Sequence, residues 1–169
     1  MKVLGIDPGV RNTGFGIIEY CGNDYSVLSF GVIKPSKKLL FHQKIMMIKN
    51  SLVDIIRRFE PDEVAIENLF YAQNVKTALS LGQVRGAVLI AVAEQNCALY
   101  EYSPLEIKKA VTGYGQADKN QVQQMIKILL KIENEKLETD ASDALATGFC
   151  HLNTRAFLPE NRENSKTLK

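Results

Sequence analysis

The chain has 169 residues, of which 46% are hydrophobic and 24% charged, and its formal net charge is +2 at pH 7. This length fits one domain with a sizeable core, and so small a charge does not by itself indicate a nucleic-acid-binding protein. Cys21, Cys97 and Cys150 are odd in number and far apart. Their spacing argues against a disulfide framework or a CxxC zinc site and fits a reducing compartment.

The first strand, residues 2–7, is apolar until Asp7, and Pro8 and Gly9 end it. A carboxylate at the end of a buried strand either accepts hydrogen bonds from the turn that follows or holds a metal ion or polarises a nucleophile. Both interpretations stay open for Asp7. Residues 13–20 and 25–34 read as two more strands joined by tight turns, which predicts an antiparallel meander. Glycines in the second strand indicate close approach of another backbone or a ligand.

Apolar residues recur at helical spacing over residues 39–59, and Pro61 closes that helix. Residues 62–68 form a fourth strand, which we expect to run parallel to the first because a helix connects the two. Glu67 stands near its end. A second long helix covers residues 75–94, and its apolar second half predicts burial by the core or by a partner subunit. Residues 97–102 read as a fifth strand.

The rest of the chain is predicted to be helical. Ser103, Pro104 and Glu106 mark the start of a short helix that ends near Gly113. Asp118 caps the next helix and Thr139 caps the last. We expect one domain over residues 1–153, followed by a polar, disordered tail over residues 154–169.

Membrane association is not expected. No apolar signal-peptide core precedes the first strand, and the longest mainly apolar stretch, residues 87–93, is far shorter than the about 20 residues that cross a bilayer. The sequence therefore predicts a cytoplasmic protein. The isolated His42 and His151 fall in helical patterns, and we interpret both as structural.

Carboxylates stand out at the ends of the predicted elements. Asp7 and Glu67 end apolar strands that we expect to be neighbours, and Asp140 and Asp143 share one face of the last helix. Taken alone, the helix pair could simply oppose the helix dipole on a solvated face. Four gathered carboxylates would repel one another unless cations lay between them, and oxygen ligands favour Mg²⁺ or Mn²⁺. Two such ions support phosphodiester hydrolysis.

Candidate nucleic-acid contacts are fewer and less specific. Lysines and arginines near the predicted carboxylates could hold phosphates, although each could be an ordinary solvated side chain. Two aromatic residues directly after the fourth strand could stack on bases or pack locally. These candidates are Lys76, Arg85, Lys108, Lys119, Phe70 and Tyr71.

Four motifs together resemble the RuvC family of bacterial Holliday junction endonucleases. They are Gly5-Ile6-Asp7-Pro8-Gly9, Ile66-Glu67 with Phe70 beyond, Leu81-Gly82-Gln83-Val84-Arg85-Gly86, and Asp140-Ala141-Ser142-Asp143-Ala144-Leu145-Ala146. They occur in the family's order and at its usual spacing, and the resemblance covers residues 1–153. Each motif alone is weak, because GIDxG also opens actin-like ATPases.

The resemblance implies a ribonuclease-H-like α/β fold, with a five-stranded mixed sheet of three antiparallel and two parallel strands and helices on both faces. It implies a homodimer that nicks two strands of like polarity in four-way DNA junctions, leaving 5′-phosphate and 3′-hydroxyl ends. Asp7, Glu67, Asp140 and Asp143 would bind two Mg²⁺ ions, for which Mn²⁺ would substitute. The second long helix would form much of the dimer interface. RuvA and RuvB are the implied partners.

The resemblance also assigns DNA contacts. Phe70 matches an aromatic residue that meets bases near the junction centre, and Lys108 and Lys119 match basic positions that handle DNA. Two alternatives remain. One is an actin-like ATPase, which would need a second domain to enclose a nucleotide, and the other is a junction-binding module without catalysis, which would have no need of four carboxylates.

Overall fold

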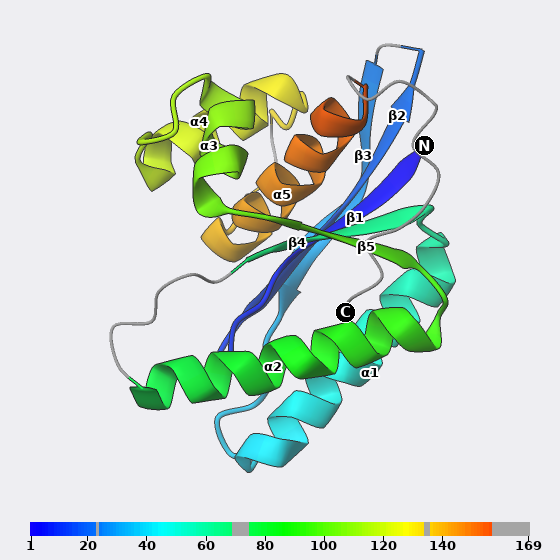
Figure 1. The fold of residues 1–169 in the computed structure, drawn as a ribbon, viewed down its shortest axis with the longest axis vertical. Coiled ribbons are helices and arrows are strands. Elements are labelled where there is room, and N and C mark those ends of the chain that lie inside the picture. The colour runs from blue at the N-terminus through cyan, green and yellow to red at the C-terminus, as the bar shows by residue number, and fades with distance from the viewer. Residues whose placement is uncertain (23, 69–74, 134–135, 157–169) are drawn as a thin grey trace, which may run out of the picture.

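A five-stranded sheet with helices on both faces organises the molecule (Figure 1). The computed structural model describes residues 1–22, 24–68, 75–133 and 136–156. The elements in chain order are β1 (Lys2–Asp7), β2 (Thr13–Cys21), β3 (Asp24–Ile33), α1 (Phe41–Phe59), β4 (Glu63–Glu67), α2 (Val75–Glu94), β5 (Ala98–Tyr102), α3 (Pro104–Thr112), α4 (Lys119–Leu129) and α5 (Thr139–Ala156).

The strand order is β3-β2-β1-β4-β5. β1, β2 and β3 form an antiparallel meander, whereas β4 and β5 run parallel to β1. The predicted mixed sheet is therefore confirmed. β1 and β4 finish at the same end of the sheet, with Asp7 and Glu67. We call this the acidic end of the sheet. Because Thr13 pairs with Ile33, β2 begins and β3 finishes there too.

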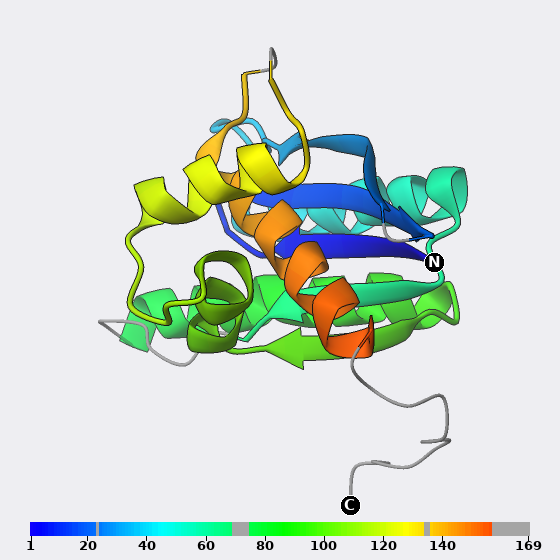
Figure 2. The same ribbon diagram turned by 90° about the horizontal axis from the view of Figure 1, so that it is seen from above.

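Two hydrophobic cores lie on opposite faces of the sheet. α1 and α2 cover one face, and α3, α4 and α5 cover the other (Figures 1 and 2). β4 contributes side chains to both cores, because Val64 and Ile66 pack toward α1 and α2 while Ala65 packs toward α5. This alternation is the one expected of a strand buried on both faces.

Local signals set the starts of α3 and α4 where the sequence predicts them, whereas Thr139, the predicted cap of the last helix, is itself the first residue of α5. The Ser103 hydroxyl accepts a hydrogen bond from the backbone N–H of Glu106, and the Asp118 carboxylate accepts one from Gln121. These caps satisfy N–H groups that lack a partner within the helix. α1 ends at Glu60, whose φ of 47° is left-handed, directly before Pro61.

α5 lies directly on the sheet, without intervening side chains, at two glycines. A Cβ at Gly5 of β1 would lie 2.0 Å from the carbonyl oxygen of Ala144, and one at Gly14 of β2 would lie 1.9 Å from that of Asp140. The close approach that the strand glycines predict is thus an approach of helix backbone. It brings the first turn of α5 to the acidic end of the sheet.

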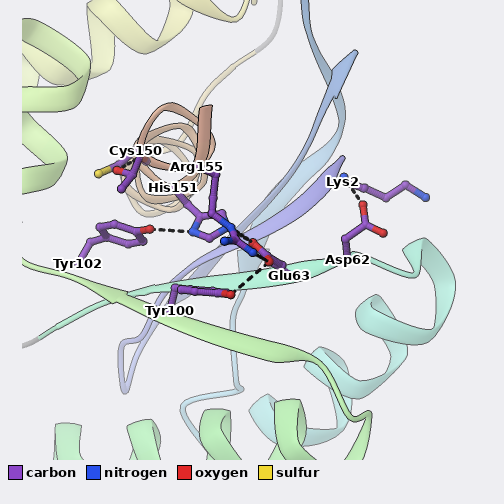
Figure 3. A network of polar contacts seen from close by, with 9 residues as sticks. Lys2, Asp62, Glu63, Tyr100, Tyr102, Cys150, His151 and Arg155 are labelled. Carbon is purple, nitrogen blue, oxygen red and sulfur yellow. Dashed lines mark hydrogen bonds and ion pairs between the residues drawn. The ribbon is translucent and has the colours of Figure 1, made fainter. Parts of the chain in front are cut away.

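A buried polar network holds the other end of α5 (Figure 3). Arg155 binds both carboxylate oxygens of Glu63, and His151 Nε2 lies 2.6 Å from Glu63 Oε2. The Tyr102 hydroxyl lies 2.8 Å from His151 Nδ1. His151 is fully buried, which confirms its structural interpretation. α5 continues to Ala156, beyond the boundary predicted at residue 153, because Arg155 belongs to this network; residues 157–169 lie outside the described chain.

The network shifts the pKa values of its members. Burial alone would raise the pKa of Glu63, but the hydrogen bonds from Arg155 and His151 outweigh burial and lower that pKa. Burial lowers the pKa of His151, and its contacts with Glu63 oppose that effect only in part. Glu63 is therefore an ionised acceptor and His151 is neutral. In that state Nε2–H donates to Glu63, and Nδ1 accepts from the Tyr102 hydroxyl.

Part of the apolar surface of α2 is exposed in the single chain, so the core alone does not cover this helix, and burial by a partner subunit stays a prediction. Leu79 is 64% exposed and Ile90 55%, and a Cβ on Gly82 or Gly86 would meet nothing within 4 Å. α2 is long and apolar enough to cross a membrane, and 28% of its apolar window is buried in the structure. The apolar run over residues 87–93 alone does not reveal this length. Length and composition are weak evidence for a membrane span, since helices of water-soluble proteins meet the same test.

Candidate active site

Three elements bring four carboxylates to the acidic end of the sheet. Asp7 ends β1, Glu67 ends β4, and Asp140 and Asp143 lie in the first turns of α5. Burial, followed by the negative charges of Asp143, Glu67 and Asp140 in that order, raises the pKa of Asp7 from 3.8 to about 7. All four predicted acids therefore form one interacting group.

The pKa values of Glu67 and Asp143 are raised for similar reasons. Burial and the charge of Asp143 raise the pKa of Glu67. Burial also raises the pKa of Asp143, even though Lys119 acts against it. Such shared repulsion is what a group of carboxylates shows when no divalent cation lies among them.

Two polar side chains hold the acids of α5. Asn12 donates from Nδ2 to Asp140 Oδ2 at 3.1 Å, and Lys119 donates from Nζ to Asp143 Oδ2 at 3.1 Å. The charge of Asp143 is the main cause of a raised pKa at Lys119. Sequence reasoning selects Lys119 but misses Asn12. No pattern in the sequence marks Asn12, because it looks like any polar residue in the connection between β1 and β2.

Lys108 joins the same site from α3. A small pocket of about 60 Å³ has Glu67, Asp143, Lys108 and Lys119 among its lining residues, with Pro104 and Ile107 at its apolar wall. Burial raises the pKa of both Glu67 and Asp143, and the positive charge of Lys108 opposes that rise in part. The two predicted lysines thus lie beside two of the four acids.

The remaining predicted contacts are placed differently. The Arg85 guanidinium pairs with Glu101 and donates to the backbone oxygen of Glu67 at 3.3 Å, so it braces the end of β4. Lys76 is exposed in the first turn of α2. Phe70 and Tyr71 lie outside the described residues.

The donor set fits divalent metal ions. Carboxylate oxygens are the ligands that Mg²⁺ and Mn²⁺ prefer. Within the described chain, no three His, Cys, Asp or Glu side chains are already arranged around one point as a metal cage. The Lys119 ammonium instead supplies positive charge beside Asp143. The raised pKa of Asp7 measures a repulsion that bound cations would relieve, so the residues present are suited to hold them.

Comparisons with known proteins agree with this arrangement. Residues 3–151 match the family model described as crossover junction endodeoxyribonuclease RuvC. The RuvC of Petrotoga mobilis is 44% identical over 155 residues, covering 92% of this chain and 95% of the relative. That of Alkaliphilus metalliredigens is 45% identical over 157 residues, covering 93% and 96%.

Solved structures extend the similarity to the fold. Thermus thermophilus RuvC in complex with a Holliday junction substrate superposes with a TM-score of 0.86 at 30% identity, covering 92% of this chain and 94% of that one. The yeast mitochondrial Holliday junction resolvase Ydc2 shares the fold, with a TM-score of 0.67 at 15% identity over 91% of this chain and 78% of that one. Fold, sequence and family model agree along nearly the whole chain, and the protein belongs to the RuvC family of crossover junction endodeoxyribonucleases.

Proposed function

We propose that this RuvC-family endodeoxyribonuclease resolves four-way DNA junctions, with Asp7, Glu67, Asp140 and Asp143 as its hydrolytic centre. The observation that carries the proposal is the electrostatic coupling of four acids from three elements, which raises the pKa of Asp7 to about 7. A purely structural role would not gather four carboxylates at one sheet end. In this proposal the enzyme nicks two strands of like polarity and leaves 5′-phosphate and 3′-hydroxyl ends.

The carboxylates would hold two Mg²⁺ ions, with Mn²⁺ as a substitute. When bound, such ions supply neutralising charge to the scissile phosphate and make water nucleophilic at neutral pH. Asp7 meets the charges of all three other acids, so it would be a central ligand of these ions. Asn12 fixes the orientation of the Asp140 carboxylate. Lys119 holds Asp143 until cations replace part of its role.

The lysines would bind the DNA backbone beside the acids. Lys108 and Lys119 flank Glu67 and Asp143, so a phosphate that reaches the acids meets positive charge at once. Exposed Lys76 would contact DNA farther along, and Phe70 and Tyr71 stay candidates for stacking on bases. Arg85 has less freedom to do so, because Glu101 and the backbone of Glu67 engage its guanidinium.

A cleavage assay tests the proposed reaction. A mobile four-way junction and a linear duplex of the same sequence are incubated with the protein, with and without Mg²⁺. Paired nicks in the junction alone, only with Mg²⁺, are the expected result. Asp7→Asn should retain junction binding and lose cleavage. Normal nicking by a folded Asp7→Asn protein would overturn the site assignment, and junction binding without any nick by the wild type would favour the binding-module alternative.

Symmetric nicking requires two active sites, and we propose that α2 supplies the dimer interface. The exposed apolar side chains of Leu79 and Ile90 and the open surface at Gly82 and Gly86 favour a second helix packing there. Sedimentation analysis of Ile90→Glu should show a monomer where the wild type is a dimer. Met46→Glu, on the neighbouring helix α1, is a control for added charge on this face of the molecule. A monomeric wild type would contradict this part.

The cellular setting follows from the proposed substrate. Chromosomal junctions in a bacterium lie in the cytoplasm, so we place the protein there, away from membranes. RuvA and RuvB are proposed partners because the family acts with them. Co-sedimentation of the protein with a RuvA-bound junction, compared with the junction alone, tests the first of these partners.

A further inference from the structure

A second cluster of positive charge lies next to the acids, on the side away from Lys108 and Lys119. A pocket of about 680 Å³ separates the β1–β2 turn from the segment between β3 and α1. Its lining, as far as the described residues form it, contains four cations and no carboxylate: Val10, Arg11, Asn12, Lys34, Pro35, Lys37 and Lys44. We call this the basic pocket.

The register of the sheet explains why these cations gather. Arg11 lies two residues before β2 and Lys34 directly follows β3, and the strand-end residues Thr13 and Ile33 are paired. Lys37 lies in the connection to α1, and Lys44 lies in the first turn of that helix. All four therefore belong to the acidic end of the sheet.

Three of the four cations have no counterion among the residues that the structure describes. Within the described parts of the chain Lys34 pairs with Glu138, whereas Arg11, Lys37 and Lys44 make no ion pair. Arg11 and Lys37 are exposed and Lys44 is half-buried. Unpaired like charges around one concavity repel one another, and they focus a positive potential that an anion would neutralise.

Asn12 connects the basic pocket to the active site. It lines the pocket, and its Nδ2 donates to Asp140 Oδ2. Across the sheet, the pocket lies at β3 and β2, the acids lie at β1 and β4, and Lys108 lies beyond Glu67. Positive charge thus stands on both sides of the carboxylates. From β3 to β4 is about 14 Å at ordinary strand spacing, which corresponds to about four base-pair steps along the axis of B-form DNA.

We propose that the basic pocket binds the phosphodiester backbone of the DNA strand that crosses the acids, a few nucleotides from the scissile phosphate. Arg11, Lys37 and Lys44 would contact successive phosphates, and Lys34 would add a weaker contact because Glu138 shares its charge. This inference rests on the proposed junction cleavage and adds a residue-level path for the substrate strand. No carboxylate lies among the described lining residues, so the pocket matches a polyanion better than a protein surface that carries charges of both signs.

The salt dependence of DNA binding tests the path. The full-length protein is titrated onto a labelled four-way junction in EDTA, where no cleavage occurs, at several NaCl concentrations. The slope of log affinity against log salt is negative, and each lost phosphate contact reduces its magnitude by about 0.9. Lys37→Ala/Lys44→Ala should reduce that magnitude by about 2 and weaken binding roughly tenfold near 0.1 M salt.

Two further variants make the result specific. Lys37→Arg/Lys44→Arg keeps the charge and should bind as the wild type does. Lys127→Ala/Lys131→Ala removes the same charge near the far end of α4, where Lys131 pairs with Asp24 at the opposite end of β3. That control should bind and cleave normally.

The outcomes separate this inference from the proposed function. A wild-type slope for Lys37→Ala/Lys44→Ala would overturn the basic-pocket path, even if the wild type cleaves junctions. An equal loss in the Lys127→Ala/Lys131→Ala control would overturn it as well, because general charge would then explain the effect. Failure of the wild type to nick junctions would instead overturn the proposed function.

Discussion

Gly14 of β2 lies against the carbonyl oxygen of Asp140, where an added Cβ would come within 1.9 Å of it. The position of Asp140 and Asp143, two of the proposed active-site acids, thus depends on the absence of a side chain in a neighbouring strand. The helix cannot move away without carrying Asp140 and Asp143 with it. A glycine in a strand is here a determinant of the site's geometry.

Gly14→Ala should therefore disturb both stability and cleavage. A backbone atom cannot rotate away from the new methyl group, so we expect a loss of about 3 kcal/mol in the free energy of unfolding and a large loss of junction cleavage. Gly16→Ala is the comparison variant, because its Cβ would first meet side-chain atoms of the buried Leu145 and not a backbone oxygen. It should cost less than Gly14→Ala, about 1–2 kcal/mol. Urea titration and the junction assay measure both effects, and equal behaviour of the two variants would contradict the argument.

Asp7→Asn should stabilise the metal-free protein while it abolishes cleavage. The pKa of Asp7 in the folded protein is raised from 3.8 to about 7, so ionisation of Asp7 opposes folding progressively as pH rises through that window. In EDTA at pH 8 the variant should be more stable by about 1–3 kcal/mol. At pH 4 the difference should nearly vanish.

Mg²⁺ should reverse that order. Binding to the folded state alone raises stability, so the Tm of the wild type should increase with Mg²⁺ while that of Asp7→Asn changes little. Thermal melts at both pH values, with EDTA or Mg²⁺, test these statements together. A wild type that is more stable than Asp7→Asn in EDTA at pH 8 would show that the acids are not crowded in solution.

Asn12→Ala should weaken metal use without unfolding the protein. Asn12 orients Asp140 through one hydrogen bond, and loss of a side chain that orients a ligand typically costs 10–100-fold in metal affinity or activity. The Mg²⁺ concentration for half-maximal cleavage should rise about tenfold. Asn12→Gln, which retains the amide, should recover part of the loss. An unchanged Mg²⁺ dependence in Asn12→Ala would show that the contact has no positioning role.

The Glu63 network should make the fold sensitive to acid. The folded-state pKa values of both Glu63 and His151 lie below their ordinary values of 4.5 and 6.5. Each group therefore contributes stability above its ordinary pKa and loses it as pH falls. Stability should decline first below about pH 6.5, as the unfolded chain gains a proton at His151, and again below about pH 4.5.

Arg155→Ala tests the same network at neutral pH. It leaves the mostly buried Glu63 carboxylate without its strongest partner, and we expect a cost of about 2–3 kcal/mol. Arg155→Ala/Glu63→Gln should be closer to the wild type than Arg155→Ala, because no buried charge is then left unpaired. A chain shortened to residue 153 should behave like Arg155→Ala. Unfolding by urea across pH 4–8 measures all of these effects.

The sequence predicts the acidic end of the sheet because local rules decide it. Asp7 and Glu67 follow buried apolar runs, and parallel strands place such ends together. Asp140 and Asp143 are three residues apart on a helix, so they share a face. The sheet order, the helices and the lysines beside the acids follow from similar patterns and from the family resemblance.

Long-range pairings are the part that the sequence does not reveal. Glu63 looks like any charged residue at the start of a strand, yet it pairs with Arg155, 92 residues away. Arg155 lies where the chain becomes polar, and composition alone assigns it to a tail. Asn12 and the cations of the basic pocket are equally ordinary in sequence. Only the register of β2 and β3 places them beside Asp140.

β4 and α5 run in opposite directions and meet twice. Glu63 begins β4 and anchors the last turns of α5, while Glu67 ends β4 beside the acids of its first turns. The spacing of the proposed catalytic carboxylates is thus set partly by contacts at the opposite end of the sheet. A genetic screen for resolution-defective alleles should recover mutations at both ends of this pair, including some that never come near DNA.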